Sequence, residues 1–257
     1  TYSGATTIIG GTLQIGNGVT SGSIGSTSAV TNNATLVYNR SDSLTAGYAI
    51  SGSGNVTKSG AGTLTLSGNN SYSGGTLISA GTLRVGNGGA SVTFGSGNVT
   101  NNGGTLLFDR SDAISVANII SGGGPLTQAG SGTVTLTATN TYNGNTTVEA
   151  GKLVVNGSIA SSAVTVTNTG TIGGAGSVGA LTIANGGTLA PGNSPGTLFA
   201  SSATWTNGGS YDWEILNVAG TAGATSGCDL LDVAGTLTLT GLTNSAFTIK
   251  LITLSDS

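Results

Sequence analysis

The sequence predicts an all-β chain wound into a right-handed parallel β-helix (β-solenoid), and three features support this. Glycine accounts for 47 of the 257 residues and charged residues for only 6%. Thr, Ser, Asn and aliphatic residues recur throughout the chain, which is the mixture of turn formers and strand formers expected of β structure. A long repeat runs through the chain, and a finer series of Thr-Leu pairs lies within it.

The long repeat is visible because residues 2–71 align without gaps onto 72–141, at an offset of 70. A third, divergent copy begins at Tyr142. A gapless duplication favours a solenoid over a sandwich or a barrel, whose strands need no fixed spacing. We therefore expect β-helix repeats over residues 1–200 and a more divergent C-terminal capping region of further coils over 201–257.

The Thr-Leu pairs set the expected turns of the solenoid. They begin at residues 12, 35, 63, 82, 105 and 133, with Thr-Val at the last, so the steps are 23, 28 and 19 and then repeat. We expect each step to be one turn of the coil. In the strand over 63–66, alternation should point Leu64 and Leu66 inward and the threonines outward. Glycines should occupy the corners, and Asn70 and Asn140 should serve there or form stacked side-chain ladders.

Charge and composition exclude several classes of protein. The net charge is −3 and the six basic residues are scattered, so a nucleic-acid partner is not expected. No run of about 18 apolar residues occurs, so we expect no transmembrane segment in this chain. The first residues lack the pattern of a signal peptide, which indicates that any export signal has been removed. The single cysteine, Cys228, cannot form an internal disulfide and is expected to be a small buried hydrophobe.

Two tracts resemble the autotransporter-associated β-strand repeat family: GAGTLTLSGNNSYSGGTLISAGTLRVGNG at 60–88 and GSGTVTLTATNTYNGNTTVEAGKLVVN at 130–156. The stretch GTLAPGNSPGTL at 187–198 resembles the segment that commonly follows the last repeats in such passengers. The resemblance implies a right-handed parallel β-helix exported to the surface of a Gram-negative-type bacterium, with adhesion, aggregation or display as its role. After YDWEI, LLDVAGTLTLTG and FTIKLITL the chain shows no tract of amphipathic strands long enough for the membrane barrel of autotransporters. We interpret it as part of a longer protein.

Catalytic candidates are few, because the chain has no histidine for a Ser-His-Asp or Cys-His arrangement. Asp212 and Glu214 flank Trp213 and would share one face of a strand, as a carboxylate pair of a carbohydrate-active β-helix would. The interpretation we favour is an outward polar face beside an inward Trp213. Asp229 and Asp232 could contribute to a calcium site, but the nonapeptide calcium motif is missing. We expect no metal site and no cofactor.

Two further groups of residues could form a binding surface. Arg40 with Asp42 and Arg110 with Asp112 recur at the same place in successive repeats, which suggests either a glycan-contacting stripe or ion pairs that stabilise a turn. We favour the ion pairs. Aromatic residues are denser late in the chain and suggest either a sugar-stacking or partner-binding patch or, as we favour, a cover for the last coil: Phe199, Trp205, Tyr211, Trp213 and Phe247.

The sequence therefore favours a non-catalytic structural or adhesive rod that is secreted or displayed on the cell surface. Its expected partners are host or bacterial surface glycans or proteins, or other copies of itself. A self-assembling extracellular filament or sheath subunit is the first alternative, because Thr1 begins partway into a repeat and open strand edges invite another chain. A carbohydrate-active β-helix that uses Asp212 and Glu214 is the second.

Overall fold

The computed structural model describes residues 3–243 and 246–254, and it divides into two compact units. Unit 1 contains the described residues up to Asp112 together with 117–126, and unit 2 contains 113–116 and the described residues from 127 onward. Every described element is a β-strand, and the strands of each unit pair in parallel with the strands of the turn before. The predicted all-β parallel β-solenoid is confirmed.

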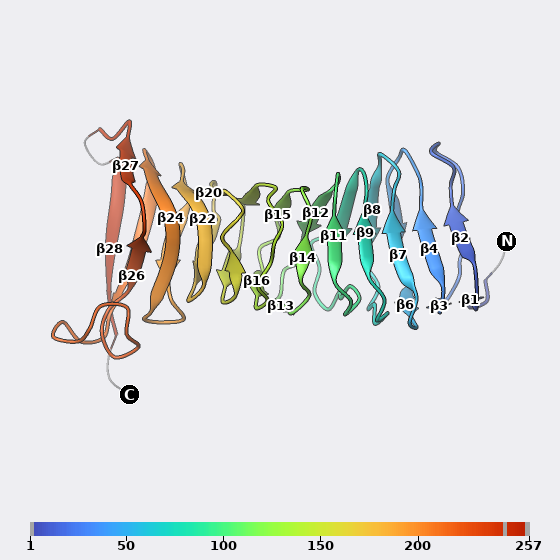
Figure 1. The fold of residues 1–257 in the computed structure, drawn as a ribbon, viewed down its shortest axis with the longest axis horizontal. Helices are drawn as coiled ribbons and strands as arrows, with labels where there is room; N and C mark the ends of the chain where they lie inside the picture. Colours follow the sequence, from blue (N-terminus) through green and yellow to red (C-terminus); the bar gives the residue numbers. More distant parts are fainter. Residues whose placement is uncertain (1–2, 244–245, 255–257) are drawn as a thin grey trace. The chain divides into compact units, whose positions relative to one another are not determined.

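Unit 1 winds through three sheets. The first sheet contains β1 (Thr6–Ile8), β3 (Ala29–Asn32) and β6 (Ala49–Ser51). The second contains β2 (Thr12–Ile15), β4 (Thr35–Tyr38), β7 (Asn55–Lys58), β9 (Thr76–Ile78), β11 (Val99–Asn101) and β14 (Ile120–Ser121). The third contains β5 (Leu44–Ala46), β8 (Thr63–Leu66), β10 (Thr82–Val85) and β12 (Thr105–Phe108). Two turns of the unit, β3-β4-β5 and β6-β7-β8, contribute one strand to each sheet. Figure 1 shows the strands of the second sheet side by side in chain order.

Unit 2 winds mainly through two sheets. One contains the last two residues of β15 (Leu126–Gln128), then β17 (Thr146–Val148), β20 (Val164–Val166), β22 (Ser177–Ile183), β24 (Thr197–Thr206) and β26 (Leu230–Val233), with β19 (Ser158–Ile159) beside β22 and β27 (Leu237–Thr240) beside β24. The other contains β13 (Ile114–Val116), β16 (Thr133–Leu136), β18 (Lys152–Val155), β21 (Thr171–Gly174), β23 (Thr188–Pro191), β25 (Gly209–Ile215) and β28 (Phe247–Thr253).

The interior of each unit is an in-register stack of aliphatic side chains. In unit 1, Leu64, Leu83 and Leu106 occupy neighbouring strands and are at most 1% exposed. In unit 2, Val134 and Leu153 stack in the same way. Parallel pairing places like positions of successive turns one strand spacing apart, about 4.8 Å, so each apolar side chain is covered by the turns above and below it.

The alternation expected in β8 is only partly correct. Leu64 and Leu66 are buried, as predicted. Thr65 is only 6% exposed, although the alternation predicted an exposed threonine. Its neighbour at the same outward position of β10 is Arg84, whose long aliphatic stem can cover a threonine methyl group.

The strand register confirms two of the three predicted steps and corrects the third. Thr12 lies beside Thr35, which is a step of 23, and Thr63 lies beside Thr82, which is a step of 19. The step of 28 is not one turn, because Thr35 lies beside Asn55. Thr63 begins the next strand of that turn, in the third sheet. The Thr-Leu series therefore moves from one sheet to the next at each step of 28.

The same shift relates whole repeats, because the repeat offset of 70 is not a whole number of turns. One turn of unit 1 advances the chain by 19 positions from Thr63 to Thr82 and by 24 from Thr6 to Val30. The strands β1, β3 and β6 of the first sheet have their repeat counterparts β9, β11 and β14 in the second sheet. The strands β2 and β4 of the second sheet have theirs, β10 and β12, in the third. One repeat thus makes three turns and about one third of a turn.

Glycine and asparagine form the corners between strands. Gly52 and its repeat counterpart Gly122 both have a φ of 100°, a left-handed conformation that glycine adopts without steric cost. The Asn70 side chain accepts a hydrogen bond from the Ile50 N–H at 2.9 Å and donates to the Thr93 carbonyl at 2.7 Å, so it links three successive turns. Asn70 thus acts through its side chain, and its backbone does not adopt the left-handed conformation of the corner glycines.

Candidate functional site

The candidate site lies on β25, where alternate side chains serve two different surfaces. Tyr211 and Trp213 line an apolar pocket, whereas Glu214 lines a separate polar hollow. Asp212 lies 3.9 Å from Lys250 of the neighbouring strand β28, measured from carboxylate oxygen to ammonium nitrogen. The strand thus places the two carboxylates on the side away from Trp213, as the period of two predicts.

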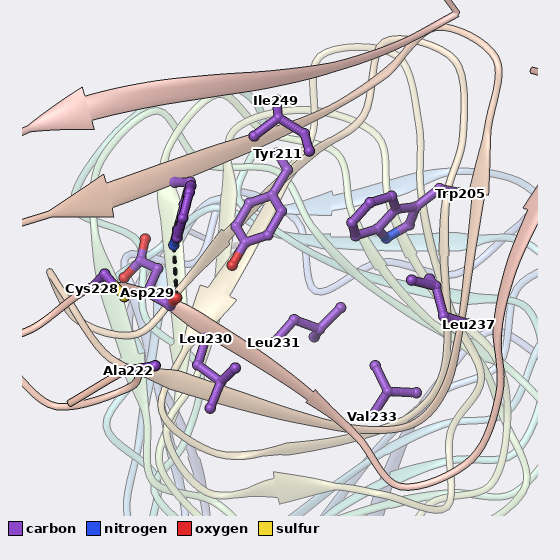
Figure 2. A pocket seen from close by; sticks show the side chains of 11 residues that line it. Trp205, Tyr211, Ala222, Cys228, Asp229, Leu230, Leu231, Val233, Leu237 and Ile249 are labelled. Carbon is purple, nitrogen blue, oxygen red and sulfur yellow. Dashed lines mark hydrogen bonds between the residues drawn. The ribbon is translucent and has the colours of Figure 1, made fainter. Parts of the chain in front are cut away.

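The apolar pocket has a volume of about 350 Å³ and lies between β25 and the last strands of unit 2. In Figure 2, Tyr211 and Trp205 lie on one side of this pocket, and Leu230, Leu231 and Val233 lie on the other. A cavity of this size with mainly apolar walls suits a small apolar ligand or side chain. The sequence had grouped Trp205, Tyr211 and Trp213 as one aromatic cluster, and the structure brings them to this pocket.

Two of the late aromatic residues also pack on each other. The ring centroids of Trp205 and Phe247 are 4.5 Å apart with an interplanar angle of 3°, so the rings are stacked. Trp205 and Tyr211 meet edge to face at 5.9 Å. Phe199, another of the late aromatic residues, is 44% exposed to solvent.

Asp229 also lines the apolar pocket, although the sequence analysis raised it only as a possible calcium ligand. It is 3% exposed. One carboxylate oxygen accepts a hydrogen bond from the Gly196 N–H and the other accepts one from the Glu214 N–H, each at 3.0 Å. Among the described residues, no group of three potential ligands forms a metal centre around it or around Asp232.

Burial raises the pKa of the Asp229 carboxyl to about 6, and this effect outweighs the two backbone hydrogen bonds, which favour the charged form. The negative charge of Glu214 adds to the increase, and the positive charge of Lys152 opposes it. Sequence alone could not identify Asp229, because its hydrogen-bond donors lie far from it along the chain, at Glu214 and Gly196. Its position directly before the apolar Leu230-Leu231 pair was the only local signal.

The polar hollow beside Glu214 is smaller, with a volume of about 190 Å³. Its wall includes Lys152 and the turn formed by Gly192, Asn193 and Ser194. Lys152 and Glu214 therefore face one hollow with opposite charges. Such a surface can bind a small polar group, and both charged side chains come from strands of the same seven-stranded sheet.

The Arg-Asp pairs of unit 1 are turn ion pairs at two different corners. Arg40 binds Asp42 through two hydrogen bonds of 2.8 and 2.7 Å, and Arg110 Nε binds Asp112 at 2.9 Å. The hydrogen bond from Arg40 lowers the pKa of the Asp42 carboxyl. For Asp112, the backbone N–H of Ser91 lowers the pKa most.

The structure does not bring the two Arg-Asp pairs together. Arg40 follows β4 of the second sheet, and Arg110 follows β12 of the third. The pairs therefore do not form the single glycan-contacting stripe that their repetition suggested. Each pair instead connects the end of one strand to the following turn.

A family model described as the passenger-associated-transport-repeat matches residues 1–15, 56–85 and 126–155. These three segments are similar to passenger-associated transport repeats. The second and third matches start at positions 56 and 126, an offset of 70, so they follow the internal duplication. The resemblance to autotransporter repeats that the sequence suggested is thereby confirmed.

Three curated relatives are similar to parts of this chain. Two extracellular serine proteases of Serratia marcescens are 45% identical over 104 residues and 37% identical over 108, which is 40% and 41% of this chain and 10% of each relative. The adhesin BmaC autotransporter of Brucella suis is 38% identical over 109 residues, 41% of this chain and 3% of the relative. The chain thus spans about a tenth or less of the relatives it matches. Within the described residues, no helix is long and apolar enough to cross a membrane.

Proposed function

We propose that this chain is the β-helical shaft of a passenger-type protein, secreted or displayed on the surface of a Gram-negative-type bacterium, where it has a structural or adhesive role. The observation that carries the proposal is the in-register aliphatic stack inside parallel turns, which makes a stable scaffold from a chain with only 6% charged residues. The relation to a protein named an adhesin supports the adhesive role. The partners we propose are surface glycans or proteins.

Binding of the purified protein to cells and to extracellular matrix tests this role. We expect saturable binding and no release of reducing ends from a panel of glycans. A protein that binds neither cells, matrix nor itself would contradict the adhesive role, and glycan turnover would contradict a non-catalytic shaft. The variants Asp212→Asn and Glu214→Gln then decide whether any turnover belongs to the carboxylates of β25, as a carbohydrate-active β-helix requires.

The neighbours of the two carboxylates argue against such catalysis. Asp212 lies opposite Lys250, and Glu214 shares a hollow with Lys152. Asp212 thus forms a surface ion pair with Lys250, and Glu214 lines the same hollow as the cation Lys152. We therefore propose a structural role for both residues.

Self-association is a second candidate, and the exposure of apolar side chains on β27 and β28 favours it. Leu237, Leu239, Ile249 and Leu251 are 48 to 58% exposed. Exposed edge strands with apolar side chains can pair with a second copy. Sedimentation over a concentration series and electron microscopy test this: polymers that disappear in a Leu239→Ser, Leu251→Ser double variant support it, and monomers at all concentrations contradict it.

A further inference from the structure

A loop over residues 216–228 follows β25, and Asp229 connects it to β26. Its backbone is internally bonded, for example from the Leu216 N–H to the Gly227 carbonyl at 2.9 Å. Val218 is 89% exposed, so this part of the loop projects into solvent. Ala222 and Cys228, which is only partly buried, form part of the wall of the apolar pocket. The position of the loop therefore determines the shape of the pocket.

Asp229 fastens this loop to two other segments. Its carboxylate accepts the N–H of Gly196, just before β24, and the N–H of Glu214 in β25. Its own N–H donates to the Glu214 carbonyl at 2.9 Å, and its carbonyl accepts a hydrogen bond from the indole of Trp213 at 2.9 Å. The latter bond is the dashed line in Figure 2. One nearly inaccessible residue thus joins the loop, the start of β24 and β25.

Burial is the main reason that the negative charge of the Asp229 carboxyl is disfavoured, and the charged groups around it act in both directions. Glu214 of β25 is a like charge, and Lys152 of β18 is the opposing cation. Tyr211 of β25 and Cys228 of the loop are the other titratable groups nearby, and burial is the main reason that the pKa of Tyr211 is raised. If the loop detaches, the carboxylate gains water, so the detached state favours its ionised form.

We propose that Asp229 is an acid-strengthened latch, which holds the 216–228 loop more firmly at acidic pH and allows it to detach more often at neutral pH. The direction follows from linkage, since the closed state binds the Asp229 proton more tightly than the open state does. The pKa of Asp229 is about 6 in the closed state. In the open state the side chain is exposed and has the ordinary aspartate pKa of 3.8. Stability of the closed state is therefore lost as the pH rises from 3.8 to about 6.

Amide hydrogen exchange of Gly196 and Glu214 tests the latch, because their N–H groups are the ones that the carboxylate holds. With intrinsic exchange rates corrected for, we expect the opening equilibrium constant to be about tenfold larger at pH 7 than at pH 5. The Gly54 amide, which bonds the Asn32 carbonyl in unit 1, is the reference and should keep its opening constant. An opening constant that is unchanged, or smaller at pH 7, would overturn the proposal.

Three variants separate this latch from a general effect of pH. Asp229→Asn removes the titration, so the opening constant of the two amides should no longer depend on pH between 5 and 7. Glu214→Gln and Lys152→Gln leave Asp229 in place but change the charges around it. Glu214→Gln should move the midpoint of the pH dependence of the opening constant to lower pH, and Lys152→Gln should move it to higher pH. A pH dependence that persists in Asp229→Asn, or a midpoint that neither charge variant moves, would assign the effect to another group.

Discussion

Lys58 and Gln128 occupy equivalent positions of successive repeats and make a specific prediction about buried charge. Lys58 is 2% exposed, and its ammonium group donates to the carbonyls of Gly60 and Ala80. Gln128 is 1% exposed and donates through its amide to the carbonyls of Gly130 and Gly132 at 2.7 and 3.1 Å. Both side chains thus provide donors to a corner whose carbonyls point inward.

We predict that Lys58→Gln changes the free energy of unfolding by about 1 kcal/mol or less, because an amide can replace the donor and the buried charge disappears. Lys58→Met has a similar volume but no donor. It should destabilise the protein by about 2 to 3 kcal/mol, since it leaves the buried Gly60 carbonyl and the partly buried Ala80 carbonyl without this donor, and an unpaired buried group costs about 1 to 3 kcal/mol. Urea unfolding of the three proteins measures both values. Equal stabilities of the Met and Gln variants would refute the role of Lys58 as a corner donor.

The same variants give a dependence on pH. Burial lowers the pKa of the Lys58 ammonium from its ordinary value of 10.5. The unfolded chain therefore binds more protons than the folded chain between the lowered pKa and 10.5, so the wild type should gain stability over Lys58→Gln as the pH rises through this window. Comparing the two proteins cancels the ionisation of buried tyrosines, which they share. A difference that stays constant or shrinks would contradict the buried cation.

Two further substitutions test the stacking of turns. Gly95→Ala should destabilise the protein by about 2 kcal/mol or more, because the new Cβ would clash with the ring of Tyr72, whereas Gly10→Ala, with nothing within 4 Å, should change stability by less than about 1 kcal/mol. Thermal unfolding compares the pair, and equal losses would contradict the close approach at Gly95. Leu64→Ala should cost about 2 to 5 kcal/mol and Leu77→Ala, at a partly exposed position of β9, about 1 kcal/mol. Similar losses in urea unfolding would contradict the deeper burial of the Leu64 side chain relative to that of Leu77.

The fold was predictable because the sequence repeats the pattern that the structure uses. Thr-Leu pairs with apolar residues at every second position specify short strands, and the steps of 19 and 23 match the observed pairing of Thr63 with Thr82 and of Thr12 with Thr35. The step of 28 was misassigned because a Thr-Leu pair marks a strand but not its sheet. Only the pairing of Thr35 with Asn55, which lacks the Thr-Leu signature, reveals the true turn.

The candidate site was less predictable, because it depends on contacts between distant residues. The i and i+2 spacing predicts that Asp212 and Glu214 share one side of β25, and the structure places Glu214 in the polar hollow and Trp213 in the apolar pocket. The burial of Asp229 depends on Gly196 and on the 216–228 loop, and no periodic pattern specifies either contact. Periodicity encodes the strands of a solenoid, whereas the loops that interrupt it carry the individual features.

The mismatch between repeat and turn also limits where a binding surface can arise on this chain. Equivalent residues of successive repeats, such as Arg40 and Arg110, follow strands of different sheets, so repetition distributes them around the coil. Residues one turn apart, such as Leu64 and Leu83, lie beside each other on the same sheet. A continuous binding stripe must therefore be built from positions that are one turn apart, and these are not equivalent positions of the repeat because the turn and the repeat have different lengths. A ligand that recognises several turns of this β-helix would contact non-equivalent residues in each, and duplication of the repeat alone would not extend its site.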